Sequence, residues 1–252
     1  REGSATDMVT IDIGGGTTDI AFAKNREIQL LTSFRFAANS LFENPLATLN
    51  TSNGIIDYYK KQICSKIAGI DKQNEIRPIF DELAERPAEM ASFMFGLKDN
   101  IYIKQNGLDN SGLDFLDLLQ NDEDFKIVFI LFYAAIIYHI AKIIKAEGYD
   151  YPRHLAFSGN GSRVISVLSP NSKTLASFTR IIFEKVVGKP MDKNLDIIGL
   201  NSQSSPKEST CKGGMFDSFV SNPSELIKVY MCGNERLVTE KDTYKTILPE
   251  YQ

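Results

Sequence analysis

Histidine and paired cysteine are scarce in this 252-residue chain, and each scarcity excludes a class of site. His139 and His154 are the only histidines, and tryptophan is absent. A histidine-rich metal site or a Ser-His-Asp triad is therefore not expected. Cys64, Cys211 and Cys232 are isolated and form no C-x-x-C pair. The sequence thus predicts no disulfide framework and a reducing, cytoplasmic compartment.

An excess of basic charge and an apolar run long enough to span a membrane are also lacking. The formal net charge of −4 gives no electrostatic argument for nucleic acid as a partner. The longest apolar run, residues 127–141, contains His139 and is followed by Lys142. We interpret it as a core helix covered on several sides, with His139 as a core histidine, and not as a membrane span.

The first residues provide no targeting signal. Residues 1–7 are polar, with no apolar signal-peptide core, and the chain does not begin with Met. We therefore expect it to be a piece of a larger protein. Hydrophobic residues make up 43% of the sequence, which is enough for one large domain or two small ones with a substantial core.

The most informative stretch is the octet Asp12-Ile13-Gly14-Gly15-Gly16-Thr17-Thr18-Asp19. Apolar, strand-forming residues precede it at 8–11 and follow it at 20–23, which predicts a tight β-hairpin. Glycines in the bend allow backbone amides to point into one concavity, and such a concavity can hold phosphate.

The acidic and hydroxyl residues of the octet refine this prediction. Asp12 would repel a phosphate unless a cation lay between them, so the pattern indicates a metal–nucleotide complex. Thr17 and Thr18 offer hydroxyls to phosphate oxygens or to an attacking water. The alternative is an ordinary glycine-rich hairpin with an exposed aspartate at each end.

The context of the octet excludes two other phosphate loops. No G-x-x-x-x-G-K-[ST] sequence is present, and residues 20–23 continue as a strand where a dinucleotide fingerprint needs a helix. The octet instead resembles the second phosphate motif of the actin-like ATPase superfamily. That superfamily includes actins, seventy-kilodalton heat-shock chaperones, bacterial actins and sugar kinases, and the D-x-G-G-G-T-T-D form is most similar to the chaperone and bacterial-actin branches.

A second glycine turn follows the apolar residues 155–157. Its sequence predicts a strand, a turn and then a helix N-terminus. A glycine turn of this kind, taken alone, often does no more than end a strand. The turn resembles the adenosine motif of the superfamily, with Asn160 in place of a glycine and matches in kind at Gly159, Gly161, Ser162 and Arg163. This resemblance implies that Arg163 packs along the adenine, for which a planar guanidinium is suited. The alternative for Arg163 is a solvated cation at a helix start.

A third stretch, Ser205 to Met215, has two interpretations. Ser205, Pro206 and Glu208 form a capping box that begins a helix, and Gly213 and Gly214 indicate close packing. The stretch also resembles the superfamily's second connecting motif, at which two lobes hinge. Capping with close packing explains it equally well without a hinge.

These elements predict an α/β fold. The order of the elements resembles that of the superfamily, and this resemblance implies a ribonuclease-H-like (actin-like ATPase) half-domain with a mixed five-stranded sheet, made of residues 1–69 and 125–218 and corresponding to subdomain IIA. Residues 70–124 are expected to form a small inserted α-rich subdomain, IIB-like, with a brief strand at 101–103, and residues 219–252 to form an extension of unknown role. Further predictions are a third strand at 26–34, irregular chain at 39–53, a strand at 195–198 and helices at 53–67, 125–148 and 175–187.

The resemblance also implies a ligand and roles for site residues. ATP and Mg²⁺ would lie between two lobes, with Asp12 orienting the hydrated Mg²⁺ or the attacking water. Thr17 or Thr18 would touch the terminal phosphate, and Asp19 would fix the hairpin instead of touching nucleotide. The β- and γ-phosphates would be held by Gly14, Gly15 and Gly16, and the adenosine end by Gly159, Asn160, Gly161, Ser162 and Arg163.

The superfamily's first phosphate motif, an earlier D-x-G-[TS] loop, does not precede Asp12. The chain therefore resembles a second lobe whose first partner is its own missing N-terminal lobe, and we expect little or no ATP turnover by this piece alone. One interpretation is half of an ATP-driven conformational switch. The other is an actin-like scaffold that self-assembles or docks proteins, with nucleotide optional or lost; a phosphoryl-transfer kinase is a weaker third. Neither nucleic acid nor membrane is expected as a partner.

Overall fold

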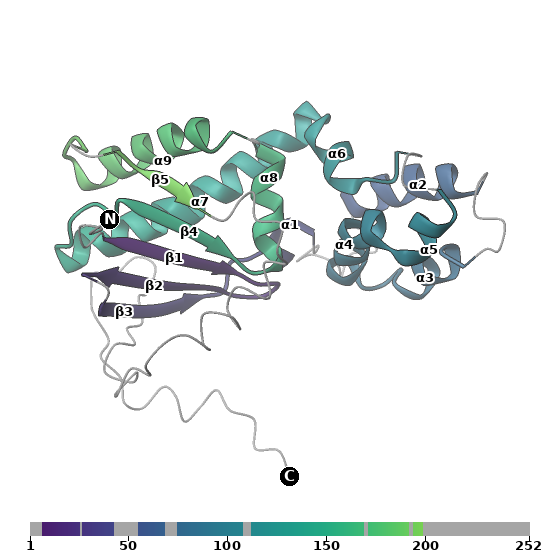
Figure 1. Cartoon of the computed structure of the whole chain (residues 1–252), viewed down its shortest axis with the longest axis horizontal. Helices are drawn as coiled ribbons and strands as arrows, with labels where there is room; N and C mark the ends of the chain where they lie inside the picture. Colours follow the sequence, from purple (N-terminus) through teal and green to yellow (C-terminus); the bar gives the residue numbers. More distant parts are fainter. Residues whose placement is uncertain are drawn as a thin grey trace, which may run out of the picture.

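The computed structural model describes residues 7–25, 27–42, 55–68, 75–107, 112–168, 171–191 and 194–198. These residues form two parts that lie side by side (Figure 1). One part, the sheet lobe, contains all the described strands and the helices α7, α8 and α9. The other, the helical part, contains α2 to α6. The predicted motif at Ser205 to Met215 and the extension 219–252 lie outside the described residues.

The sheet has the mixed, five-stranded character that the sequence predicts. Its order is β3-β2-β1-β4-β5, with antiparallel pairing of β1 with β2 and of β2 with β3, and parallel pairing of β4 with β1 and with β5. The strands are β1 (Met8–Ile13), β2 (Thr18–Lys24), β3 (Glu27–Phe34), β4 (His154–Ser158) and β5 (Asp196–Ile198). The glycine bend therefore joins two neighbouring strands, and the turn at Gly159 leaves the strand on the other side of β1.

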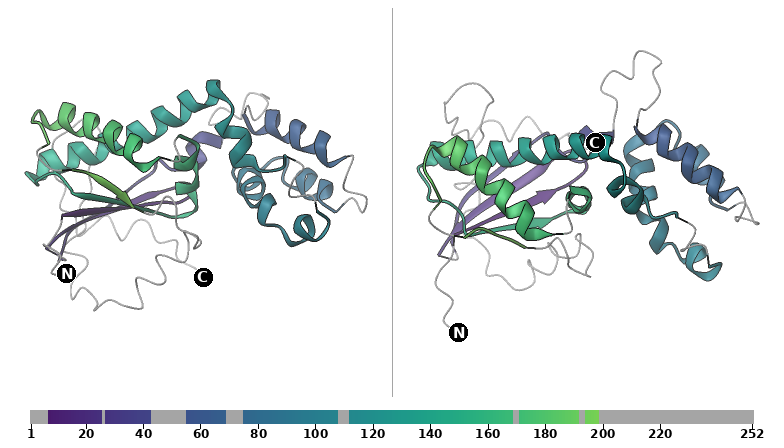
Figure 2. Two further views of the ribbon diagram at one scale, coloured as in Figure 1. Left: turned by 45° about the horizontal axis from the view of Figure 1, so that its top comes forward. Right: turned by 90° about the horizontal axis from the view of Figure 1, so that it is seen from above.

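Two long helices cover one face of the sheet, α7 (Glu123–Glu147) and α9 (Ser172–Val187) (Figure 2). Burial along β1 alternates strictly, because successive side chains of a strand point to opposite faces. Val9, Ile11 and Ile13 are fully buried. Asp12 belongs to the opposite, half-buried set, so the core and the candidate site use different faces of the same strand.

Helix caps explain where α7 begins and ends. The Asp122 side chain accepts hydrogen bonds from the amides of Asp124 and Phe125, and Gly148 ends the helix in the left-handed region at φ 69°. The predicted helix at 125–148 is thus confirmed, with a start two residues earlier. Within it, half-buried His139 sets its ring edge-on against Phe34 at a centroid distance of 4.6 Å, and burial lowers the pKa of its imidazole.

Aromatic side chains form the core of the helical part. The ring of Tyr59 lies 5.4 Å from that of Phe115, which in turn lies 4.8 Å from that of Phe95. The elements are α2 (Ile55–Ile67), α3 (Arg77–Glu82), α4 (Pro87–Gly96), the 3₁₀ turn η2 (Leu97–Asp99), α5 (Ile101–Gln105) and α6 (Phe115–Gln120). Helix α2, which we assigned to the lobe, packs instead with α3 and α4, so the helical part starts near residue 55.

Two local predictions are wrong. Residues 101–103 form α5 and not a strand, because the Asn100 side chain accepts hydrogen bonds from the amides of Tyr102 and Ile103 and so caps a helix. The stretch 39–53, predicted to be irregular, begins with the short helix α1 (Asn39–Phe42). The Asn100 cap outweighs the strand propensity of residues 101–103. The helix α1 is instead accounted for by its packing on α4 and α7.

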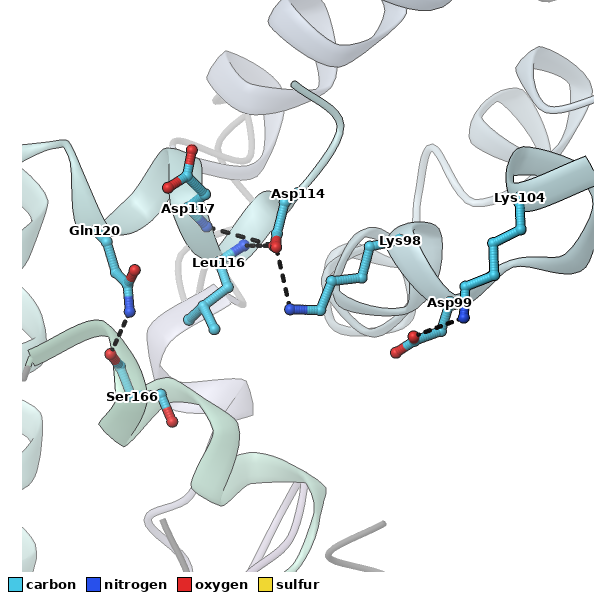
Figure 3. Close-up of polar contacts among 8 residues, drawn as sticks. All are labelled: Lys98, Asp99, Lys104, Asp114, Leu116, Asp117, Gln120 and Ser166. Atoms are coloured by element: carbon cyan, nitrogen blue, oxygen red, sulfur yellow. Dashed lines mark hydrogen bonds and ion pairs between the residues drawn. The ribbon is translucent and has the colours of Figure 1, made fainter. Parts of the chain in front are cut away.

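A hydrogen bond joins the two parts beside the second glycine turn. The Gln120 Nε2 of α6 donates to the Ser166 carbonyl oxygen of α8 (Ile165–Leu168) at 2.7 Å (Figure 3). Nearby, Asp114 caps α6 and pairs with Lys98 Nζ at 3.1 Å. Helix α6 is therefore fixed both to the helical part and to the segment that follows the Gly159 turn.

Candidate functional site

The glycine bend between β1 and β2 is held by its own carbonyl groups. The Gly14 amide donates to the Thr17 carbonyl at 2.9 Å and closes the bend. The Gly14 and Gly15 carbonyls accept from the amides of Ala38 and Asn39, at 3.2 and 2.8 Å. The start of α1 therefore occupies the acceptors of the bend.

The rest of the bend lies at the surface. Gly15, Gly16 and Thr17 are exposed, and within the part of the chain that the structure describes their amides donate to no backbone carbonyl outside the strand ladders. A Cβ built on Gly16 would meet nothing within 4 Å. An exposed bend of this kind leaves room for an anion at its amides, and the phosphate nest stays a prediction.

A row of polar side chains crosses the sheet just before the bend. Asp12 lies opposite Asp19 on β2 and opposite Ser158 on β4. Directly opposite residues share one face, so two carboxylates lie side by side there. Like charges in this position destabilise a sheet, and a cation between them would remove that cost. Asp19, which we expected only to fix the hairpin, thereby becomes a candidate cation neighbour.

The second glycine turn packs directly on the first. Gly159 has φ +79°, and a Cβ there would lie 2.3 Å from Asp12 Oδ1 and 2.3 Å from the Ile13 carbonyl oxygen. A Cβ on Gly161 would lie 2.6 Å from the Gly14 carbonyl oxygen. Only glycine allows this approach. The bend and the turn therefore lie together at one end of the sheet, where the parallel strands β1 and β4 have their carboxyl ends.

A cleft of about 380 Å³ opens beside these two glycine segments. Its floor comes from the bend and the turn, and its opposite wall comes from α1 and α4. The lining residues are Gly14, Gly15, Ala38, Asn39, Phe42, Ala88, Ala91, Ser92, Phe95, Asn160, Gly161, Arg163 and Val164. The volume is at the small end of the range for small-molecule sites.

Several predicted residues line this cleft or the exposed bend. Gly14, Gly15, Asn160, Gly161 and Arg163 are cleft residues. Gly16 and Thr17 are exposed at the neighbouring bend, and Asp12 and Gly159 lie beneath, in contact with each other.

Two hydroxyls assigned to ligand binding have structural positions instead. Thr18 is fully buried, and its Oγ1 donates to the Phe36 carbonyl at 2.7 Å. Ser162 is 7% exposed, and its Oγ donates to the Gly159 carbonyl at 2.6 Å. The first bond fixes the start of β2, and the second fixes the turn, so neither hydroxyl points at a ligand.

The residues that sequence reasoning missed are Asn39 and the α4 wall. Asn39 Oδ1 would lie 2.9 Å from a Cβ on Gly15, so the side chain rests against the bend. On α4, Ala88, Ala91 and Ser92 recur at helical spacing and give a small-residue face. That spacing was the available signal, but the sequence does not show which surface the face lies against.

No protein-family model and no curated protein matches this chain. Among solved structures, it is similar to the ethanolamine utilization protein EutJ from Carboxydothermus hydrogenoformans, at 13% identity, with 77% of this chain and 44% of that chain covered and a TM-score of 0.28. It is also similar to a chain of the PilM–PilN type IV pilus biogenesis complex, at 12% identity, 81% and 37% coverage and a TM-score of 0.26.

This chain therefore covers less than half the length of either chain. At these identities and TM-scores, neither likeness carries an argument about the site. The function has to be inferred from the geometry of the glycine segments.

Proposed function

We propose that this chain is the ATP- and Mg²⁺-binding second lobe of an actin-like, chaperone-like ATPase, and that it acts as a nucleotide-driven conformational switch in the full-length protein. The observation that carries the proposal is the contact between the two glycine segments. Asp12 Oδ1 and the Ile13 carbonyl leave no space for a side chain at Gly159. Two motifs far apart in the sequence are thus packed together at the edge of one cleft, which supports a single ligand bound to both.

The donor groups fit a magnesium–phosphate complex better than a bare metal. No group of three or more His, Cys, Asp or Glu side chains that could hold a metal is present within the described ranges. Magnesium is commonly held by one or two carboxylates together with substrate phosphates and water. Asp12 and Asp19 are two such carboxylates, and the amides of Gly15 and Gly16 supply the matching phosphate donors.

The base end of the nucleotide is assigned to the turn side of the cleft. Arg163 is half-buried and lines the cleft, and its guanidinium can stack on a purine. Ala88, Ala91 and Phe95 of α4 give the facing wall an apolar character. A flat heterocycle between an arginine plane and small apolar side chains is compatible with this wall.

The chemistry proposed for the intact protein is positioning and charge stabilisation, as in other phosphoryl transfers. Asp12 would orient Mg²⁺-bound water, and Thr17 would reach the terminal phosphate from the exposed end of the bend. Mg²⁺ would neutralise charge developing on the phosphate oxygens. Because the first phosphate motif is not in this sequence, we assign hydrolysis to the two-lobed protein and only weak binding to this chain.

A second function, a non-catalytic scaffold or assembly module, is favoured by a different observation. The outer face of α7 exposes large apolar side chains, among them Ile127 and Leu131. Exposed apolar surface of this kind marks interaction sites. In this second function nucleotide binding is optional or lost, and protein contacts are the main role.

Calorimetry with Mg-ATP separates the two functions. We expect binding by the wild-type chain that is abolished by EDTA, and at least about a tenfold weaker affinity in Gly16→Val, because the added side chain enters space at the bend. Gly96→Val is the matched control, since a Cβ there also meets nothing within 4 Å, and its affinity should be unchanged. Wild-type affinity in Gly16→Val would contradict the phosphate assignment.

A turnover assay tests the division of labour between the lobes. The purified chain should release no phosphate from ATP above the buffer rate. Release that Asp12→Ala abolishes would show a complete site in this chain and would overturn the two-lobe proposal. If the chain binds no Mg-ATP at all, the scaffold function is the one supported.

A further inference from the structure

The outward face of α7 is apolar where solvent should favour polar residues. Ile127, Leu131 and Tyr138 are 59%, 65% and 52% exposed, and Ala135 between them is exposed as well. Their spacing places them on one side of the helix, opposite the buried Phe129. The expectation that this helix is covered on several sides is therefore wrong within the described residues.

Two charged residues end this apolar row. Asp124 lies one turn before Ile127 and Lys142 one turn after Tyr138, and both are exposed. Neither side chain forms an ion pair in the described ranges. We call the whole row the α7 stripe; it comprises Asp124, Ile127, Leu131, Ala135, Tyr138 and Lys142.

We propose that the α7 stripe is a homodimer interface, at which the α7 helices of two copies pack antiparallel around a twofold axis. The stripe matches itself when it is read in opposite directions. Each charged or large residue then meets a complementary one of the second copy: Asp124 meets Lys142, Ile127 meets Tyr138, and Leu131 meets Ala135. A twofold interface needs this kind of self-complementary surface.

Charge complementarity selects the antiparallel arrangement and the second copy as occupant. Parallel packing would place Asp124 against Asp124 and Lys142 against Lys142, which is unfavourable. Antiparallel packing forms the opposite-charge pair twice, about 27 Å apart at 1.5 Å rise per residue. Leu131 lies near the axis, where an interface is most fully desolvated.

A membrane is the competing occupant. By length and composition alone α7 could cross a bilayer, yet half of its most apolar window is buried inside the lobe. The buried half packs on α9 and, through Tyr133 and His139, on the sheet residues Phe157 and Phe34, so crossing would require the lobe to open. The charged residues at both ends of the stripe match a second copy better than lipid tails.

Sedimentation equilibrium of the whole chain tests the proposal, and charge-swap variants give its most discriminating measurement. We expect a monomer–dimer equilibrium. Asp124→Lys and Lys142→Asp, each alone, should raise the dimer Kd about tenfold, since each creates two like-charge pairs. The double variant should return to within about threefold of wild type, because only antiparallel packing restores both pairs.

A second variant tests the centre of the stripe. Leu131→Glu should raise the dimer Kd by at least about thirtyfold, as loss of a central interface residue does. Ile101→Glu is the matched control, because Ile101 is 71% exposed on α5, outside the stripe, and the dimer should be unchanged. Circular dichroism verifies that each variant is folded, and the charge swaps remain decisive if Leu131→Glu is not.

Three results would overturn the proposal. They are a wild-type chain that stays monomeric at every concentration, a dimer that Leu131→Glu leaves intact, and single swaps that the double variant does not rescue. A monomer that co-sediments with phosphatidylglycerol vesicles would assign the stripe to a lipid surface. The proposal does not depend on nucleotide, so its failure leaves the calorimetric test untouched.

Discussion

The sheet lobe and the helical part achieve order by different means. In the lobe, strands pair through backbone bonds and two glycine segments approach closely enough that even one added carbon collides with oxygen atoms. In the helical part, short helices begin at the Asn100 and Asp114 caps and pack through aromatic rings. The lobe therefore depends on backbone proximity, and the helical part depends on side chains that can be exchanged for others of similar shape.

This difference indicates which part of the molecule can position the proposed ligand most exactly. The amides of the bend are held by β1, β2 and α1, whereas the α4 wall is held by packing. Rigid backbone donors suit a phosphate group, whose position must be exact, and a packed wall can adjust to a base. The two parts should then differ in their tolerance to substitution, and variants in each part can measure that difference.

The largest effect is expected at Gly159. Gly159→Val should lower the free energy of unfolding by about 4 kcal/mol or more, because its Cβ would lie 2.3 Å from two oxygen atoms while φ stays at +79°. Urea unfolding followed by circular dichroism measures the change.

Gly188→Val separates the steric effect from the backbone effect. Gly188 also has positive φ, at +86°, but a Cβ there meets nothing within 4 Å. It should lose only about 1–2 kcal/mol from left-handed strain. Equal losses in the two variants would show that contact between the glycine segments does not stabilise the lobe.

An intermediate effect is expected at Asp122, where the two parts meet. Its Oδ2 accepts from the hydroxyl of buried Tyr59 on α2 at 2.8 Å, while Oδ1 caps α7. Asp122→Ala should lower the free energy of unfolding by about 2–3 kcal/mol, since it removes a cap and leaves a buried hydroxyl without a partner. Differential scanning calorimetry measures the change.

Tyr59→Phe and Asp122→Asn are the controls for this prediction. Tyr59→Phe removes only the hydroxyl and should lose about 1 kcal/mol. Asp122→Asn keeps an acceptor for the cap and should recover most of the loss. If Asp122→Ala unfolds with wild-type stability, the junction is not where the helical part is attached.

The sequence predicts the sheet lobe better than the helical part for a physical reason. In the lobe, the octet and the apolar runs around it carry strong local signals, and the expected hairpin, long helix and mixed sheet are all present. In the helical part, short elements depend on long-range packing. The isoleucines of α5 favour a strand, and the cap at Asn100 decides for a helix.

The candidate site was also only partly predictable from the sequence. The glycine segments are recognisable by composition, and the resemblance adds their order. The burial of Thr18 and Ser162 was not predictable, because a hydroxyl looks identical in sequence whether it faces a ligand or the Phe36 or Gly159 carbonyl. The α4 wall was missed because its distance from the octet along the chain hides their proximity.

The smallest effect is a dependence of stability on pH that comes from His139 in the sheet lobe. Both histidines, His139 and His154, lie outside the helical part. Burial lowers the pKa of His139 in the folded state below its unfolded value of about 6.5. Between these two pKa values the unfolded chain binds the additional proton, so the free energy of unfolding rises with pH.

This stabilisation is fully present above the unfolded pKa and is lost as pH falls through the lower, folded pKa of His139. His139→Gln should flatten the decline, measured by urea unfolding at a series of pH values below neutrality, by less than the losses expected for Gly159→Val and Asp122→Ala. His154→Gln is the matched control and should keep the His139 contribution. If the dependence of the unfolding free energy on pH is unchanged in His139→Gln, solvent reaches the imidazole ring at the edge of Phe34. This end of the lobe would then tolerate substitution as well as the helical part does.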